Sequence, residues 1–320
     1  MKTVSIHKII VFLLIPMAGI FILLSSCKKD TLVTEPIATG NLYVSLDQFF
    51  QMNGAQPQYF DIIEPTIDDT ITGKNGMVFI ITGNTFVNAN AQLPKGKIKV
   101  EIKEILNVKD MILSDKQTVS NGYILESGGE FYFNAVDSSG EILTIAPNKY
   151  IQIKIPNSNP SPNMEVFWTY SVTAGPNWSN YSPSTNPSYV YDDYPNKLYN
   201  MYLGDLGYSW ISCGKYYSNT NSKTSITVTP NIAPNQSDNV EVRAFLVFKS
   251  INSVMSVSGS PIVSPQIPTG MDAVLVGVGV GKSKKVYFGK QSITISANMQ
   301  VNLQMSVTTD TAVKQGLSNL

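Results

Sequence analysis

The stretch ITISANMQVNLQMSV, residues 293–307, alternates an apolar residue with a small or polar one along its whole length. Its apolar positions are Ile293, Ile295, Ala297, Met299, Val301, Leu303, Met305 and Val307. Successive side chains of a β-strand point to opposite faces of the sheet, so this period of two predicts a strand with one buried and one wet side. Such strands are typical of antiparallel sheets, in which one face can meet water.

The same alternation recurs in both halves of the chain. Residues 97–103 and 150–155 alternate isoleucine or valine with polar residues, and residues 242–248 are almost continuously apolar, as in a central strand. Helical periodicity is confined to residues 107–114 and 311–320. Many short strands separated by turn signals predict an all-β fold of two antiparallel, immunoglobulin-like β-sandwiches.

The proline- and asparagine-rich stretch PNSNPSPN, residues 156–163, predicts the boundary between the two domains. On this interpretation an N-terminal sandwich covers residues 41–156, a C-terminal sandwich covers 163–308, and a tail covers 309–320. The alternative is a long loop inside one domain.

The first thirty residues predict export. Lys2 and Lys8 precede an uncharged apolar run over residues 9–24, and two serines then lead to Cys27. A charged start, an apolar middle and a small-residue end are the features of a signal peptide. As a helix the run covers about 24 Å, which is short of the roughly 30 Å hydrocarbon core. A tilted transmembrane anchor is the alternative.

Leu24-Ser25-Ser26-Cys27 resembles a bacterial lipobox, and the following Lys-Lys-Asp is similar to the start of many Bacteroidetes lipoproteins. The resemblance implies a signal peptide over residues 1–26, lipidation of Cys27 and a tether over residues 27–40. Several acyl chains make a stable membrane anchor. Lys28 stands where an aspartate would resemble an inner-membrane retention signal. We therefore expect the outer membrane, with the protein facing the cell surface or the periplasm.

Three stretches resemble a ZU5-like β-module, namely TGKNGMVFIITGNTFVN at 72–88, GKIKVEIKEIL at 96–106 and LESGGEFYFNA at 125–135. With WISC at 210–213 and the terminal strand, most of residues 58–307 resembles a group of Bacteroidetes lipoproteins of unknown function. The resemblance implies a fold and a compartment, and no reaction.

The residue inventory excludes several kinds of catalytic site. The only histidine, His7, lies in the signal peptide, and lipidation of Cys27 would leave Cys213 as the only thiol. Such a chain forms no Ser-His-Asp, Cys-His or His-based zinc site and no intrachain disulfide. Cys213 is expected to be a small buried hydrophobe. We therefore predict that the protein is not an enzyme and holds no cofactor or metal.

Charge and motif spacing argue against nucleic-acid and nucleotide partners. The chain has 23 basic and 23 acidic residues, with Arg243 as the only arginine, whereas nucleic-acid binders present a clustered basic face. GVGVGKS, residues 277–283, imitates a P-loop but has one residue too few before its Gly-Lys pair. A hairpin with strands 273–280 and 285–289 is predicted instead.

The segment 165–217 is rich in aromatic residues and contains all three tryptophans. One tryptophan lies in a loop-like setting, and tyrosines surround an Asp-Asp pair. Flat rings beside carboxylates can stack on sugars, and exposed aromatic patches mark binding sites. The alternative is that the rings belong to the core. The predicted ligand-binding residues are Trp178, Tyr189, Tyr191, Asp192 and Asp193.

Paired carboxylates leave two further alternatives open. Asp192-Asp193 and Asp68-Asp69 lack the spaced ligand series of a calcium loop, so turn formation is the preferred role. A carboxylate-dependent glycoside hydrolase would need two such groups about 5–9.5 Å apart.

Three Asp-Thr-aliphatic tripeptides also resemble the O-glycosylation acceptor of Bacteroidetes envelope proteins. The candidate threonines are Thr31, Thr70 and Thr311.

These features predict a non-enzymatic lipoprotein of the cell envelope with a binding or structural role. A glycan-binding accessory lipoprotein that uses the aromatics of residues 165–217 is the second hypothesis, and a carboxylate-dependent hydrolase is the third. The expected partners are the membrane, through Cys27, and a glycan or an envelope protein.

Overall fold

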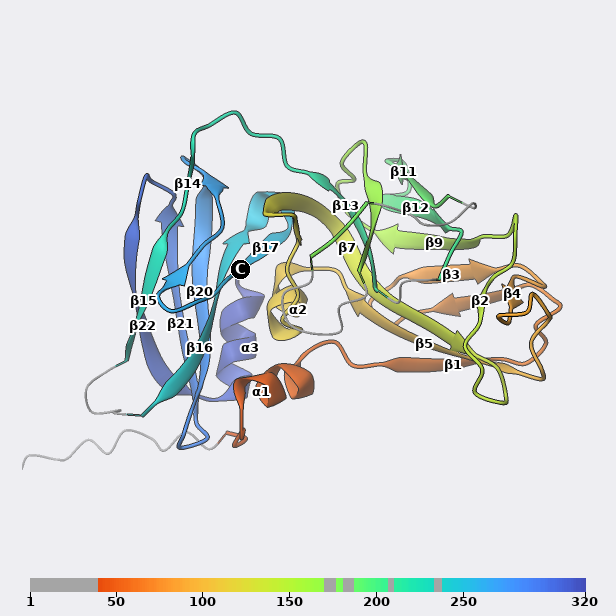
Figure 1. Ribbon diagram of the computed structural model, residues 1–320, viewed down its shortest axis with the longest axis horizontal. Coiled ribbons are helices and arrows are strands. Elements are labelled where there is room, and N and C mark those ends of the chain that lie inside the picture. The colour runs from red at the N-terminus through yellow and green to blue at the C-terminus, as the bar shows by residue number, and fades with distance from the viewer. Residues whose placement is uncertain (1–39, 170–176, 181–186, 207–209, 233–237) are drawn as a thin grey trace, which may run out of the picture. The chain divides into compact units, whose positions relative to one another are not determined.

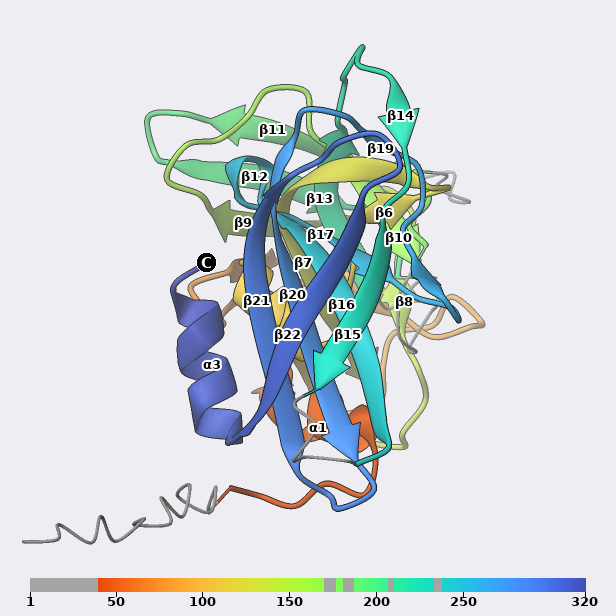
Figure 2. The same cartoon turned by 90° about the vertical axis from the view of Figure 1, so that its left-hand side faces the viewer.

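The structure of the protein is a computed structural model that contains several β-sheets and three short α-helices in its described part (Figures 1 and 2). The predicted signal peptide, Cys27 and Thr31 lie outside the described residues. The described residues are 40–169, 177–180, 187–206, 210–232 and 238–320.

The described chain is mostly β, which confirms the predicted all-β class. The strands are β1 (Gln58–Ile62), β2 (Asp69–Thr72), β3 (Val78–Ile81), β4 (Phe86–Val87), β5 (Ile98–Ile105), β6 (Val119–Ser120), β7 (Tyr123–Val136), β8 (Thr144–Ile145), β9 (Ile151–Pro156), β10 (Glu165–Thr169), β11 (Tyr189–Asp193), β12 (Leu198–Leu203), β13 (Trp210–Tyr216), β14 (Lys223–Thr224), β15 (Thr227–Ile232), β16 (Val240–Phe248), β17 (Ser253–Val257), β18 (Ile262–Val263), β19 (Ile267–Pro268), β20 (Asp272–Gly281), β21 (Val286–Thr294) and β22 (Gln300–Thr308). The helices are α1 (Leu46–Asn53), α2 (Val108–Leu113), the 3-10 helix η2 (Lys249–Ile251) and α3 (Asp310–Ser318).

The first sandwich consists of two antiparallel sheets that face each other. One has the order β1-β5-β7-β13-β10, with β6 paired to β7, and the other has the order β11-β12-β9-β3-β2. The alternation seen in the sequence explains their packing, because Ile98, Val100 and Ile102 of β5 are fully buried and face Ile151 and Ile153 of β9 in one core. The predicted half-buried strands at 97–103 and 150–155 are therefore confirmed.

The second β-structure is a seven-stranded sheet of order β17-β16-β20-β21-β22-β15-β18. All its pairs are antiparallel except β15 with β22, which run parallel. The sheet curls on itself, since an isolated bridge joins Ser258, after β17, to Val263 in β18. One face encloses a core around Leu246, Leu275 and Leu303.

Three short helices accompany the sheets. Each begins at a side chain that accepts a hydrogen bond from the first turn: Ser45 from Gln48 N, Asn107 from Asp110 N and Thr309 from Ala312 N. They share a third core with the six-stranded and seven-stranded sheets, and Figure 1 shows α1 and α2 between the two β-structures. Buried members of this core include Phe49, Phe50, Met111, Ile112, Trp178, Trp210, Phe245, Val276, Val313 and Leu317.

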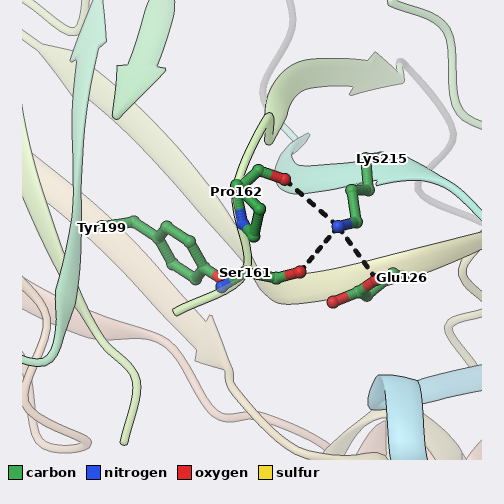
Figure 3. A network of polar contacts seen from close by, with 5 residues as sticks. All are labelled: Glu126, Ser161, Pro162, Tyr199 and Lys215. Carbon is green, nitrogen blue, oxygen red and sulfur yellow. Dashed lines mark hydrogen bonds and ion pairs between the residues drawn. The ribbon is translucent and has the colours of Figure 1, made fainter. Parts of the chain in front are cut away.

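The predicted domain boundary at residues 156–163 is wrong. Strands β10 to β13 follow this stretch, yet β10 and β13 extend the sheet of β7, and β11 and β12 extend the sheet of β9. In Figure 3 the Lys215 amine reaches Ser161 Oγ at 2.6 Å, the Pro162 carbonyl at 3.1 Å and the Glu126 carboxylate at 3.3 Å. The stretch is a loop within the first sandwich, as the alternative interpretation held.

The stretch 293–307 is also not one strand. Strand β21 ends at Thr294 and β22 begins at Gln300, because the chain turns at Asn298, whose φ is +51°. Asparagine tolerates this left-handed conformation better than most residues. The buried positions Ile293, Ile295 and Val301 still obey the period of two on either side of the turn.

The predicted hairpin and the two predicted helical segments agree with the structure. Strands β20 and β21 form the expected hairpin around residues 282–285, and β21 follows the P-loop-like stretch where a nucleotide site would need a helix. Helices α2 and α3 cover most of the two segments with helical period. The tail 309–320 therefore packs onto the fold, with Val313 and Leu317 buried.

Candidate ligand-binding face

Four tyrosines gather at one end of the sheet β11-β12-β9-β3-β2, on its outer face. We call Tyr150, Tyr189, Tyr191 and Tyr202 the tyrosine cluster. The ring centroids of Tyr189 and Tyr202 are 5.0 Å apart and their planes differ by 12°. Tyr191 lies 5.6 Å from each of these two rings, and Tyr150 lies 5.8 Å from Tyr189. The four rings therefore form one continuous aromatic surface.

Strand periodicity places these rings on the outside. On β11, Val190 packs against the core of the first sandwich, so Tyr189 and Tyr191 point the opposite way. On β12, Met201 and Leu203 are buried, which turns Tyr202 outward. The register pairs Tyr189 directly with Tyr202 across the two strands.

The cluster is open to solvent at the border of the sheet. Tyr189 is 41% exposed and Tyr191 is 51% exposed. Among the described strands, β11 is at the edge of its sheet and pairs with β12 alone. A ligand can therefore reach the rings from the face and from the edge.

Polar side chains continue the surface beside the rings. Gln152 Nε2 donates to Asn200 Oδ1 at 3.2 Å, and Asn200 Nδ2 donates to Asp193 Oδ2 at 3.2 Å. Asn196 Nδ2 contacts both oxygens of the same carboxylate, at 3.1 and 3.0 Å. Amide and carboxylate groups in a row beside aromatic rings can exchange hydrogen bonds with the hydroxyls of a sugar.

The protonation states suit a surface that binds neutral hydroxyls. Hydrogen bonds from Asn196 lower the pKa of Asp193, so its carboxylate is ionised at neutral pH. Desolvation and the neighbouring Tyr191 raise the pKa of Tyr189 and of Tyr202, so their hydroxyls keep their protons. The face thus offers both acceptors and donors.

Two of the predicted ligand-binding residues are not part of this face. Trp178 is fully buried in the core shared with the helices, where its Nε1 donates to the Gln117 carbonyl at 2.6 Å. The prediction that Trp178 contacts a ligand is therefore wrong, and the alternative that the ring belongs to the core holds for this residue. Asp192 alternates to the side of β11 opposite Tyr191, and Tyr194 lies in the turn beyond it. The structure brings together Tyr189, Tyr191 and Asp193.

The other singled-out residues have separate places. Asp68 accepts a hydrogen bond from Gly83 N, 15 residues away, and Asp69 lies in β2, where it accepts one from Thr70 N. Thr70 on β2 and Thr311 in the first turn of α3 are exposed. Cys213 is buried, as predicted, and burial raises the pKa of its thiol.

Within the described ranges, no three His, Cys, Asp or Glu side chains lie close enough together to hold a metal ion. No helix in this part of the chain combines the length and apolar character needed to cross a membrane.

Sequence reasoning missed half of the tyrosine cluster and its polar neighbours. Tyr150 and Gln152 occupy the wet positions of the predicted strand at 150–155, and Asn200 and Tyr202 occupy those of β12. The alternation was visible, but nothing in the sequence indicated that β9 and β12 pair beside β11.

No protein-family model, curated protein or solved structure matches the chain. The lipoprotein and ZU5-like resemblances therefore remain predictions.

Proposed function

We propose that this protein is a non-enzymatic, lipid-anchored protein of the outer membrane that binds glycans on its tyrosine cluster. The observation that carries the proposal is the exposed cluster of four rings with the polar row of Gln152, Asn200 and Asp193 beside it. Aromatic faces pack on the apolar faces of sugar rings, while the polar row satisfies hydroxyls.

The place where the chain enters the fold is compatible with an anchor at Cys27. Asn41 Nδ2 donates to Asp310 Oδ2 at 2.9 Å, and Tyr43 N donates to the Lys284 carbonyl at 3.0 Å. This entry lies beside the hairpin of β20 and β21, whereas β11 and β12 lie at the opposite end of the unit in both views (Figures 1 and 2). The proposed glycan-binding face thus lies away from Asn41 and Tyr43, near which the described chain begins.

A glycan array tests the binding proposal. The wild-type protein should bind a defined group of glycans, and Tyr191→Ala should weaken that binding at least about tenfold, as expected for loss of a stacking contact and its neighbours. Tyr59→Ala is the matched control, because Tyr59 is equally exposed on β1 of the other sheet. No binding, or equal loss in both variants, would refute the proposal.

The anchor is tested separately. Intact mass of the native protein should show cleavage before Cys27 and added acyl chains, and Cys27→Ala should move the protein from the membrane to the soluble fraction. A Cys27→Ala protein that stays in the outer membrane would contradict lipid anchoring without affecting the glycan proposal.

A further inference from the structure

Two exposed apolar side chains flank the point where the chain enters the fold. Tyr43 is almost completely buried, whereas its neighbours Leu42 and Val44 are 66% and 70% exposed. The segment is held in place, because Val44 N donates to Gln48 Oε1 at 2.7 Å at the start of α1. Isolated exposed hydrophobic residues are common on protein surfaces, so these two do not mark a binding surface by themselves.

Three lysines lie beside this apolar pair. The tip of the hairpin formed by β20 and β21 carries Lys282, Lys284 and Lys285, and each of them is exposed. Tyr43 N donates to the Lys284 carbonyl at 3.0 Å, so the tip is in contact with the chain entry. Both views show the tip and the entry at the same end of the ribbon (Figures 1 and 2). We call Leu42, Val44 and the three lysines the entry patch.

The charges of the lysines face solvent. None of the three forms an ion pair with any residue in the described part of the chain. The carboxylates that contact the tip and the entry are only partly exposed and are hydrogen-bonded to neutral groups. Asp238 accepts from Ser283 N and from the Tyr287 hydroxyl. Asp310 accepts from the Asn41 amide.

We infer that the entry patch docks onto a bilayer surface that contains anionic phospholipids. Leu42 and Val44 would lie at the boundary between headgroups and acyl chains, and the lysines would contact the headgroup phosphates. Apolar side chains bordered by lysines are typical of protein surfaces that lie in a membrane interface. Lysine also suits this boundary because its apolar stem can lie along the acyl chains while its amine stays among the headgroups.

The length of chain that precedes the patch favours a membrane as its partner. Leu42 follows Cys27 by 15 residues. An extended chain covers at most about 3.5 Å per residue, so a lipid on Cys27 would keep the patch within about 50 Å of the bilayer. Docking is then intramolecular, and a patch of low affinity suffices. The inference therefore rests on the proposed lipid anchor, and it leaves the tyrosine cluster, at the opposite end of both views, accessible (Figures 1 and 2).

A spin-labelled lipid tests the docking. The lipid-anchored protein is purified from membranes and placed in nanodiscs of phosphatidylcholine and phosphatidylglycerol that contain the spin label at the headgroup. The readout is the paramagnetic broadening of methyl NMR signals. We expect strong broadening for Leu42 and Val44 and little for Ile142, which is also 70% exposed but lies in the first sandwich. Nanodiscs of phosphatidylcholine alone should reduce the broadening at least about threefold.

A lysine variant tests the charged part of the patch. Lys282→Gln/Lys285→Gln should reduce the broadening at Leu42 and Val44 at least about threefold, since each lysine near an anionic surface strengthens binding by about fivefold. Lys97→Gln/Lys99→Gln is the matched control, because these two lysines are equally exposed but lie at the start of β5. This control should broaden as the wild type does. An unchanged methyl signal of the buried Leu275 shows in each variant that the seven-stranded sheet is folded.

The outcomes separate the docking from the anchor on which it depends. A protein that leaves the nanodiscs refutes the lipid anchor and the docking together. A protein that stays in them without broadening at Leu42 and Val44 refutes the docking alone. Equal broadening at Ile142, or unchanged broadening in Lys282→Gln/Lys285→Gln, also overturns the inference. Signals of Leu42 and Val44 that shift with protein concentration in detergent, and do not broaden in nanodiscs, would assign the patch to a second copy of the chain instead.

Discussion

Arg243 on β16 forms an ion pair with Asp115, which precedes it by 128 residues and follows α2. The pair thus connects the turn after α2 to strand β16 of the seven-stranded sheet. Asp115 is 5% exposed and its φ is +51°, so the carboxylate has little access to water and sits in a turn of unusual conformation. Both side chains also line a cavity of about 550 Å³, together with residues of α1, β5 and β13.

Removal of one member of this pair should destabilise the protein more than removal of both. Arg243→Met leaves the Asp115 carboxylate buried beside a methionine and should cost about 3 kcal/mol of unfolding free energy. The double variant Arg243→Met/Asp115→Asn removes the orphaned charge and should recover most of that loss. Urea denaturation of the four proteins in the cycle measures the coupling, and additive effects would contradict it.

Stability should fall as the pH rises from about 5 to about 8, because of Glu130. Its pKa is raised from 4.5 to about 8 in the folded protein, so in this window the folded chain holds a proton that the unfolded chain has lost. Folding binds protons there, and the free energy of unfolding decreases with increasing pH. Relative to its effect at pH 5, Glu130→Gln should become more stabilising at pH 8.5 by roughly 3–4 kcal/mol, as a shift from 4.5 to about 8 implies.

Glu101→Gln provides the control for this pH dependence, since Glu101 lies on the neighbouring strand β5 with its side chain partly exposed. Its denaturation midpoint in urea should follow that of the wild type at every pH. A Glu130→Gln protein whose pH profile matches the wild type would show that another group causes the dependence.

Replacement of Trp178 separates its structural role from ligand binding. Trp178→Phe removes the 2.6 Å hydrogen bond to Gln117 and leaves a gap in a closed core, so we expect a loss of about 2–3 kcal/mol of stability. Glycan binding at the tyrosine cluster should be unchanged below the unfolding transition. Thermal denaturation and the same glycan array provide the two readouts, and a selective loss of binding would restore Trp178 as a ligand residue.

The individual strands of this fold could be predicted from sequence because their signal is local. β5 and β9 bury every second residue, and the pattern specifies this directly. The pairing of β13 with β7 and β10 could not be predicted, since residues about 80 and 45 positions away share no periodic signal with it. The error at residues 156–163 follows from this, because a proline-rich loop looks the same inside a domain as between two.

The candidate site shows the same difference between local sequence patterns, which could be predicted, and long-range strand pairing, which could not. Tyr189, Tyr191 and Asp193 lie close in sequence and could be predicted together, whereas Tyr202 and Gln152 join them only through strand register. Trp178 was misassigned because its neighbours resemble a loop, and the core that buries it comes from the helices and the seven-stranded sheet.

The loop at residues 156–163 should depend on Lys215 for its attachment. The Lys215 amine contacts Ser161, Pro162 and Glu126, and the side chain is only 25% exposed, so Lys215→Met removes three polar contacts from a half-buried place (Figure 3). We expect a loss of about 1–3 kcal/mol, with hydrogen exchange increased at Ser161, whose N–H donates to Tyr199 at 2.6 Å. Lys197→Met, at an exposed lysine in the β11–β12 turn, should change neither quantity. If residues 156–163 were instead a free linker between two domains, Lys215→Met would leave both the stability and the exchange of this loop unchanged.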